Sequence, residues 1–295
     1  MGAAHPATLE CLLPARAPLE SAALLRFLGA RAIPGVEQVE DGVYRRTLRA
    51  GKHSGWLTAS FLDGKDTLRV EVSASLAPAL GQVLARVKRL FDLDADPASI
   101  VTTLSADSHL KPLVEQAPGL RLPGSVDGFE QAVRAVLGQQ VSVAAARTLA
   151  GRIVETFGEP LETPYPALTH LFPTPARLAE TDEAAFSGLG ITGARIRTLR
   201  TLAELVATKA LVLKPGVNVE KTVETLLTIP GIGPWTAQYI ALRALHWPDA
   251  FPTGDLGLLH ALNETDPKRL QERAECWRPW RSYAVMHLWH SLETK

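Results

Sequence analysis

The sequence contains few cysteines, with only two among its 295 residues. Cys11 and Cys276 lie far apart, and neither belongs to a Cys-x-x-Cys pair. A zinc site or an iron–sulfur cluster held by cysteines is therefore excluded at the usual ligand count. Reduced thiols are expected rather than a disulfide, because the sequence has the features of a cytosolic chain.

Long hydrophobic runs are absent too. No stretch of roughly 18 or more apolar residues occurs, so no membrane span and no membrane partner are expected. Pro6, Pro14 and Arg16 interrupt the apolar residues near the N-terminus, and no basic segment precedes them. This pattern argues against a secretory signal and predicts a cytoplasmic protein.

The sequence has no excess of charge of either sign, with 31 Lys and Arg against 31 Asp and Glu. Proteins that neutralise nucleic-acid phosphates usually carry a positive excess. A neutral protein can still bind DNA if its basic groups gather on one face, or if backbone amides at helix starts bind phosphate. The charge balance therefore neither supports nor excludes DNA as a partner.

The length favours two domains, and the first, residues 1–118, shows strand-like and helix-like patterns. We predict helices over residues 19–28 and 76–91, and strands over 44–48, 56–61 and 68–72. The segments between the strands contain the Gly and Asp residues typical of hairpin turns. This part is expected to be an α+β domain, an antiparallel sheet with helices.

The second domain, residues 119–295, is expected to be all-helical, with no further convincing strand. Asp127 begins a helix whose apolar residues recur with a period of 3.6, and Gly138 interrupts it. Thr174 and Pro175 resemble an N-cap followed by proline at the first helical position. Short connections containing Pro and Gly join these helices, as in a compact helical domain.

Residues 218–246 predict two helices joined by a glycine turn. Asn218 can cap the first helix, which stops at Pro230, and Pro234 opens the second. Gly231 and Gly233 allow positive φ and a close approach of the backbone to an anion. The second helix presents unpaired amides and the positive end of its dipole, which suits a phosphate. A plain tight turn between helices is the alternative interpretation.

Asp255 is the candidate catalytic carboxylate. It follows a Pro/Gly loop and begins an apolar helix-like run, and it lies one helix and one loop after Trp235. That spacing can return the acid to the mouth of the helical hairpin. The alternative is an N-cap carboxylate, a common role worth about 1 kcal/mol. The two interpretations are compatible, because a capping carboxylate is held rigidly by its helix.

These motifs together resemble a known family. The run 227–237, followed by the Pro/Gly loop and Asp255, is similar to the helix-hairpin-helix, Gly/Pro, Asp superfamily of DNA glycosylases. Within it, the sequence most resembles the bacterial DNA-3-methyladenine glycosylase II (AlkA) type. Residues 129–142, 172–175 and 277–284 carry further resemblance. The resemblance spans residue 119 to the end, and the preceding α+β domain also fits that type.

The resemblance implies that Asp255 stabilises a cationic sugar, or activates water, as the base departs. The transition state is oxocarbenium-like, and a nearby fixed anion stabilises its charge. The resemblance also assigns Trp235, Tyr239 and Trp289 to the base pocket. Electron-rich rings attract a cationic base by about 0.5–2 kcal/mol, which predicts broad specificity. The alternative is that these aromatic residues belong to the core.

A base in duplex DNA must be flipped out before it can be attacked. The resemblance places the side chain that fills the gap at Gln140, where some relatives have leucine, so this chain departs from them with a polar residue. An ordinary polar loop is the alternative for Gln139 and Gln140. The residues expected to contact DNA are Gln139, Gln140, Gly231, Ile232, Gly233 and Thr236.

No cofactor is expected, apart from a structural monovalent cation, Na⁺ or K⁺. By resemblance, the backbone carbonyls of Leu227, Ile229 and Gly231 would hold it. Relatives that also cut the strand have a lysine two residues after the second glycine, where this chain has Trp235. Without an amine there, no Schiff base can form, so we expect no lyase activity.

The predicted function is a monofunctional DNA glycosylase in base excision repair, active on alkylated purines such as 3-methyladenine and 7-methylguanine and leaving an abasic site. It is expected to act on damaged double-stranded DNA as a monomer, in the cytoplasm and associated with the nucleoid if bacterial. The alternative is a non-catalytic damaged-DNA binding protein, which Asp255 and the aromatic set disfavour. A glycosylase for oxidised or deaminated bases is a third interpretation. Some relatives are fused to a methyl-transfer domain with reactive cysteines. This sequence shows no such segment, so direct methyl transfer is not expected.

Overall fold

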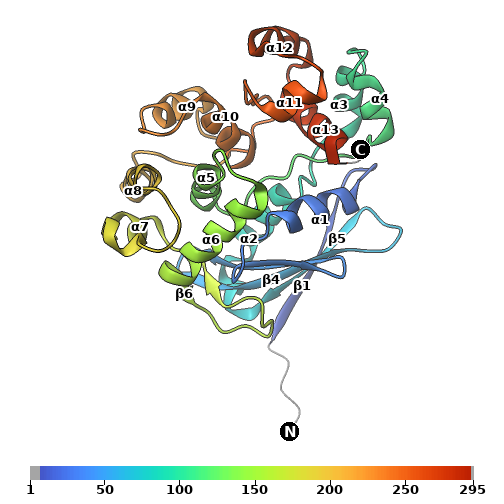
Figure 1. The fold of residues 1–295 in the computed structure, drawn as a ribbon. Helices are drawn as coiled ribbons and strands as arrows, with labels where there is room; N and C mark the ends of the chain where they lie inside the picture. Colours follow the sequence, from blue (N-terminus) through green and yellow to red (C-terminus); the bar gives the residue numbers. More distant parts are fainter. Residues whose placement is uncertain (1–6, 294–295) are drawn as a thin grey trace.

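The structure is a computed structural model that describes residues 7–293, with a sheet at one end and helices gathered at the other (Figure 1). The sheet has five antiparallel strands in the order β1-β5-β4-β3-β2. The strands are β1 (Thr8–Pro14), β2 (Glu37–Glu40), β3 (Val43–Ala50), β4 (His53–Phe61) and β5 (Thr67–Ser73). No helix in the described part of the chain is long and apolar enough to cross a membrane.

The three predicted strands and their two hairpins are confirmed as β3, β4 and β5. Gly51 and Gly64 take positive φ in the two turns, 62° and 64°, a conformation that glycine adopts without steric cost. Strands β1 and β2 were not predicted. β1 pairs with β5, which lies far along the chain, and β2 has only four residues. β1 therefore gives no local signal, whereas β2 is joined to β3 by the two-residue turn Asp41-Gly42, with both residues at positive φ, a hairpin signal that the sequence prediction missed.

Three helical elements accompany the sheet: α1 (Ser21–Ala30), η1 (Ala74–Ala79) and α2 (Leu80–Leu90). The single helix predicted over residues 76–91 is wrong in its first turn, which is a 3₁₀ helix containing Pro78. Proline lacks an N–H and disfavours the α conformation in the residue before it. The regular α-helix therefore begins only after this turn.

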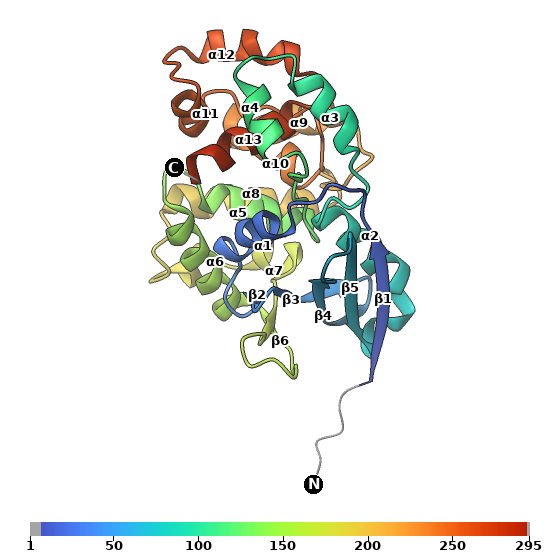
Figure 2. The same ribbon diagram turned by 90° about the vertical axis from the view of Figure 1, so that its right-hand side faces the viewer.

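Helices α3 (Pro97–Leu104) and α4 (Leu110–Gln116) cross to the opposite end of the molecule, where α4 packs against α13 (Arg281–Glu293) (Figure 2). Asp107, between them, accepts hydrogen bonds from Arg273 Nε (3.0 Å) and Nη2 (2.8 Å) and from Trp277 Nε1 (3.0 Å). The domain boundary near residue 118 stays a prediction.

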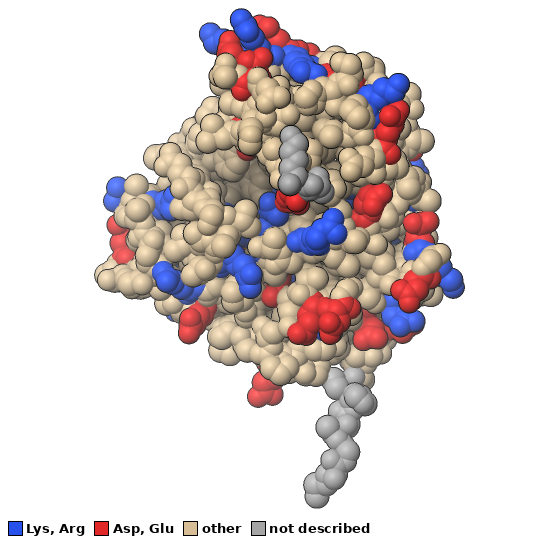
Figure 3. Space-filling view, turned by 45° about the vertical axis from the view of Figure 1, so that its right-hand side comes forward, with Lys and Arg blue, Asp and Glu red and all other residues tan. Residues whose placement is uncertain are grey.

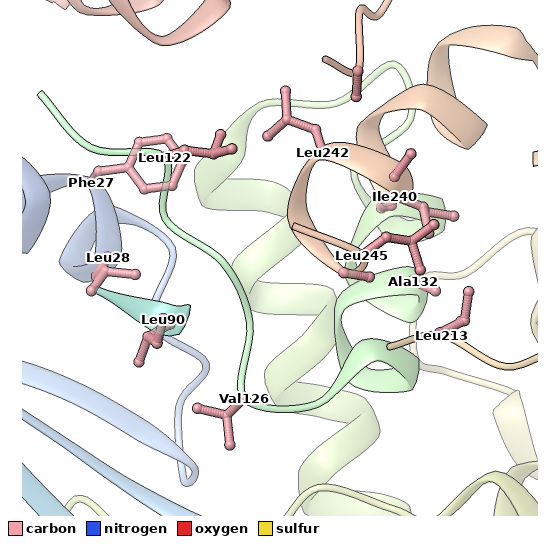
Figure 4. Packing of buried hydrophobic residues seen from close by; sticks show 14 of the residues in the cluster. Phe27, Leu28, Leu90, Leu122, Val126, Ala132, Leu213, Ile240, Leu242 and Leu245 are labelled. Carbon is pink, nitrogen blue, oxygen red and sulfur yellow. The ribbon is translucent and has the colours of Figure 1, made fainter. Parts of the chain in front are cut away.

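The chain then returns through residues 119–127, which lie between the two parts. Figure 4 shows Leu122 and Val126 of this segment, with α1 and α2 on one side and α5 and α10 on the other. These side chains are buried at 0% and 4% exposure. The sheet end and the helical end therefore share one continuous hydrophobic core.

The rest of the chain is helical, apart from one small ladder. Its helices are α5 (Gly128–Leu137), α6 (Val143–Phe157), α7 (Pro175–Glu180), η2 (Glu183–Phe186), α8 (Gly193–Ala207), α9 (Val219–Leu227), α10 (Pro234–Arg243), α11 (Leu256–Ala261), α12 (Pro267–Ala274), η3 (Glu275–Trp277) and α13. The predicted caps Asp127, Thr174 and Asn218 each accept a backbone N–H at a helix start. The expectation of no strand after residue 119 is corrected by β6 (Glu159–Pro160) and β7 (His170–Leu171), which are too short to show alternation.

A buried ionic network joins the sheet to α5. Arg46 of β3 donates from Nη2 to Glu130 (2.7 Å) and from Nη1 to Glu37 (3.2 Å). Glu37 also accepts from Arg134 Nη1 (2.7 Å) and from the Tyr44 hydroxyl (2.6 Å). Burial alone would raise the pKa of Glu37, but the Arg134 and Arg46 guanidiniums lower it to about 2. The network holds an ionised carboxylate against α5, whose other end leads into the functional site.

Candidate active site

Asp255 lies at the start of α11, held by three N–H donors. Its Oδ1 accepts from the Leu258 amide (3.0 Å), which confirms the predicted N-cap. The indole Nε1 of Trp235 donates to Oδ2 (2.8 Å), and that of Trp289 donates to Oδ1 (3.1 Å). The carboxylate is half-buried and lines a cavity. Three donors from α10, α11 and α13 thus fix its position and orientation.

The three aromatic residues predicted for a base pocket lie together around this carboxylate. Trp235 and Tyr239, one turn apart on α10, stack with ring centroids 5.2 Å apart and planes inclined by 6°. Tyr239 and Trp289 lie 6.2 Å apart at 56°. All three line the cavity rather than only the core.

The cavity has a volume of about 390 Å³, within the range typical of small-molecule sites. Figure 3 shows a hollow beside the C-terminal end of α13, with a surface that is mostly uncharged. Its walls come from residues that follow α1, from α5, α6, α10 and α13, and from Asp255 at the start of α11. The lining residues include Arg31, Ile33, Gln131, Arg134, Ala135, Gly138, Val143, Ala146, Arg147, Trp235, Tyr239, Arg243, Asp255, Trp289 and Glu293.

Two arginines, neither predicted as a site residue, share one aromatic ring at the cavity. The guanidinium carbon atoms of Arg31 and Arg243 lie 3.7 Å and 4.8 Å from the Phe27 ring centroid. Among the residues that the structure describes, no carboxylate lies within ion-pair distance of either arginine. Arg31 and Ile33, which follow α1, line the cavity, so the N-terminal part of the chain builds one wall of it.

Arg243 is buried and bound mainly to carbonyl groups. Its Nε donates to the Pro123 carbonyl (2.6 Å), its Nη2 to that of Gly124 (3.1 Å) and its Nη1 to the Tyr239 hydroxyl (3.3 Å). Burial of this charge lowers the pKa of Arg243 to about 10. Burial raises the pKa of Tyr239, but the guanidiniums of Arg243, Arg31 and Arg134 together outweigh it, and the net direction is downward. Tyr239 is therefore anchored to the segment that joins the two parts of the fold.

The predicted helical hairpin is formed by α9, a glycine turn and α10. Gly231 has φ of 91°, and a Cβ there would lie 2.3 Å from Thr198 Oγ1. Thr198 of α8 donates to the Pro230 carbonyl (2.7 Å), and Ile232 is buried at 5% exposure. Ile232 thus anchors the turn in the core, and α8 packs against the turn. Positive φ is confirmed at Gly231 and is wrong at Gly233, whose φ is −92°.

The start of α10 carries no side-chain cap. Its N-cap is Gly233, which is exposed, and Pro234 follows at the first helical position. Several neighbouring helices are capped by Asp, Ser, Thr or Asn side chains. The uncapped amides and the helix dipole leave this end suited to an anion.

Alanine substitutions at the two turn glycines are expected to separate stability from DNA binding. Gly231→Ala combines positive φ with a clash against Thr198, and should lower the free energy of unfolding by about 2–3 kcal/mol. A Cβ at Gly233 meets nothing within 4 Å and needs no positive φ. Gly233→Ala should therefore fold normally yet bind duplex DNA less tightly, because the methyl group of the new alanine lies in front of the free backbone amides at the start of α10.

Urea unfolding and fluorescence anisotropy with labelled duplex DNA measure the two effects. Equal stability of the two variants would contradict the role of Thr198 and positive φ. Unchanged DNA affinity of Gly233→Ala would contradict a phosphate contact at the start of α10.

The loop between α5 and α6 adjoins this turn. Gln139 Nε2 donates to the Gly231 carbonyl (2.8 Å) and to Thr236 Oγ1 (2.9 Å), and Arg195 donates to the Gln139 carbonyl. Thr236 is buried at 3% exposure. Gln139 thus ties the loop to the hairpin, while Gln140, with φ of 55°, is exposed. The expected DNA contacts of these residues stay predictions.

The carbonyls predicted to hold a monovalent cation are those of Leu227, Ile229 and Gly231. The Ile229 carbonyl accepts from the Ile232 amide (3.0 Å), and the Gly231 carbonyl accepts from Gln139. A carbonyl oxygen has two lone pairs, so each keeps one for a cation. The donor chemistry therefore fits a hard monovalent ion, which would stiffen the turn. The expectation of no other cofactor stays a prediction.

Two family models match the chain: the AlkA N-terminal domain over residues 10–127, and the HhH-GPD superfamily base excision DNA repair protein over residues 133–282. The chain is 44% identical over 294 residues to a probable bifunctional transcriptional activator/DNA repair enzyme AlkA of Mycobacterium tuberculosis. That match covers 98% of this chain but 58% of the relative, so the chain spans little more than half of that protein's length.

A second relative, DNA-3-methyladenine glycosylase 2 of Escherichia coli, is 40% identical over 274 residues, which cover 93% of this chain and 94% of the relative. Among solved structures, the 3-methyladenine DNA-glycosylase from Archaeoglobus fulgidus matches with a TM-score of 0.81 and 22% identity. It covers 95% of this chain and 97% of that one. At this identity the likeness shows a shared fold.

Proposed function

Because the chain belongs to the HhH-GPD superfamily of base excision DNA repair proteins, we propose that it hydrolyses the N-glycosidic bond of alkylated purines in duplex DNA. The observation that carries this proposal is the Asp255 carboxylate, fixed by two indole N–H groups at an aromatic cavity. The two indole donors go beyond the single amide that an N-cap binds, which favours a catalytic role for the carboxylate over binding alone.

The damaged nucleotide is flipped out of the duplex and its base enters the cavity. The hairpin turn holds a backbone phosphate with the free amides at the start of α10, and the exposed Gln140 occupies the gap in the duplex. The purine stacks against Trp235, Tyr239 and Trp289, whose π-faces attract a positively charged base. The base is thus held with its sugar near Asp255.

As the glycosidic bond breaks, its electron pair leaves with the base and the sugar becomes positively charged. The Asp255 carboxylate stabilises that charge as it develops. Water then adds its oxygen to C1′ and loses a proton to the solvent, leaving an abasic site. An alkylated purine that already carries positive charge leaves without protonation, so no general acid is required.

Strand cleavage through a Schiff base needs an amine near C1′. Trp235 stands where bifunctional relatives have lysine, and it donates to Asp255. No lysine lines the cavity in the described part of the chain. We therefore propose that the enzyme is monofunctional and leaves the DNA strand intact. We also propose that it acts as a monomer.

The test is release of free bases from methylated duplex DNA. We expect release of 3-methyladenine and 7-methylguanine, with the strand cut only after alkali treatment converts abasic sites to breaks. A duplex containing 8-oxoguanine serves as the control for the oxidised-base interpretation. Binding of methylated DNA without release of any base would favour the non-catalytic alternative, and nicking without alkali would contradict a monofunctional mechanism.

A further inference from the structure

Gln131 of α5 is a buried polar residue for which the mechanism above has no role. It is 3% exposed and lines the cavity. Arg134, Ala135 and Gly138 line it too, at spacings of three, four and seven residues from Gln131. One face of α5 therefore forms a wall of the cavity, with Gln131 within it.

No side-chain hydrogen bond of Gln131 occurs among the residues that the structure describes, and neither polar atom of its amide is sealed from the cavity. Its neighbour Arg134, by contrast, is paired with Glu37 and Glu130. An amide that is open to the cavity can hydrogen-bond solvent when the cavity is empty, and a ligand that replaces those hydrogen bonds binds better than one that leaves them unmade. The Gln131 amide is therefore available to a partner that arrives with the ligand.

Charge alone does not select a cationic base in this cavity. Four arginines line it, Arg31, Arg134, Arg147 and Arg243, against two carboxylates, Asp255 and Glu293. Stacking on the aromatic rings accepts any flat base. Recognition therefore needs a group that reads the base edge, and Gln131 is the only amide among the described lining residues.

We propose that Gln131 is a specificity-determining residue that hydrogen-bonds the edge of the flipped base, donating from Nε2 and accepting at Oε1. This proposal rests on the proposed glycosylase function. An amide matches an edge with a donor and an acceptor side by side, as glutamine does with adenine in DNA. A half-turn of the amide exchanges its donor and acceptor positions. It can therefore match both 3-methyladenine, with its amino group beside a ring nitrogen, and hypoxanthine, with its carbonyl beside N1–H.

The same chemistry disfavours bases without a donor on that edge. In 1,N6-ethenoadenine the former amino nitrogen is closed into a ring and has no hydrogen, so Oε1 of Gln131 is left unpaired. A site built to form a hydrogen bond rejects ligands that cannot form it. Gln131 thus lets the site accept both 3-methyladenine and hypoxanthine, while it disfavours 1,N6-ethenoadenine.

The first test compares wild type with Gln131→Met, a substitution of similar volume without the amide. Single-turnover release is measured with hypoxanthine and 1,N6-ethenoadenine, both neutral, so that charge does not confound the comparison. We expect hypoxanthine release to fall about tenfold, and ethenoadenine release to change less than about threefold, because only the first uses both hydrogen bonds. Gln82→Met, at an exposed position on α2, is the matched control.

A second variant distinguishes direct contact with the base from packing. Gln131→Glu loses the donor for both bases, but its negative charge favours the cationic 3-methyladenine over the neutral hypoxanthine, so the ratio of 3-methyladenine to hypoxanthine release should rise. A purely structural role would lower both rates together, and thermal unfolding reports any loss of folding directly. Parallel changes for all bases, or none, would overturn the proposal. If wild type releases no damaged base at all, the proposed function itself fails, which is a separate result.

Discussion

Replacement of Asp255 by asparagine is expected to slow base release by about a thousandfold, the scale seen when a fixed electrostatic stabiliser is lost from an active site. Asparagine has nearly the same shape and is an equally good N-cap, so it can still accept from the Leu258 amide. What it removes is the negative charge, together with one of two acceptors for the Trp235 and Trp289 indoles. Folding and DNA binding should be largely retained.

The measurement is single-turnover release of 7-methylguanine, with duplex affinity measured alongside. Asp266→Asn is the matched control, because Asp266 caps α12 by accepting the Lys268 amide and does not line the cavity. Equal rates for wild type and Asp255→Asn would remove the carboxylate from the mechanism. Loss of both activity and DNA affinity would instead indicate damage to the cavity.

Replacement of Arg46 by methionine is expected to lower the free energy of unfolding by about 3–5 kcal/mol, because breaking a buried ion pair leaves charges uncompensated. Arg46 is 2% exposed and pairs with Glu37 (3.2 Å) and Glu130 (2.7 Å). Arg134 alone cannot compensate both carboxylates. Because Arg134 lines the cavity, the change should also alter base release.

Urea unfolding measures this loss, and Arg49→Met provides the comparison. Arg49 is also on β3, but its pair with Glu159 is partly exposed, at 32% and 60% of the two side chains. Such surface pairs contribute about 0–1 kcal/mol. If both variants lost the same stability, the network would not be what joins the sheet to α5.

Several features were predictable because their signals are local. The caps at Asp127, Asn218 and Asp255 depend on one side chain and the next turn of its own helix. The hairpins between β3, β4 and β5 depend on glycines a few residues from the strands they join. The predicted family and fold class are confirmed as well, since motifs of this kind are spread along the whole chain.

Other features gave no local signal. β1 was missed because it pairs with β5, far along the chain. β2 is the exception: its Asp41-Gly42 turn was a local signal, and the strand was overlooked because it has only four residues. The Gly231 turn was predictable, but the hydrogen bond from Thr198 of α8 to the Pro230 carbonyl in that turn was not, because the two residues are 32 positions apart in the sequence. Arg31, Gln131 and Arg243 were missed for the same reason, since nothing in their neighbours distinguishes them from surface or core residues.

The sequence by itself determined the chemistry available to this protein: a carboxylate that caps a helix, aromatic rings at helical spacing, a glycine turn suited to phosphate, and tryptophan where a lysine would permit strand cleavage. The tertiary structure alone decided where these groups meet, because the cavity is lined by residues just after α1 and by residues of α5 and α13, which lie far apart along the chain. It also decided that Gln131 lines that cavity. Packing and burial, which depend on all the elements at once, place an ordinary helical glutamine where a ligand can bind it.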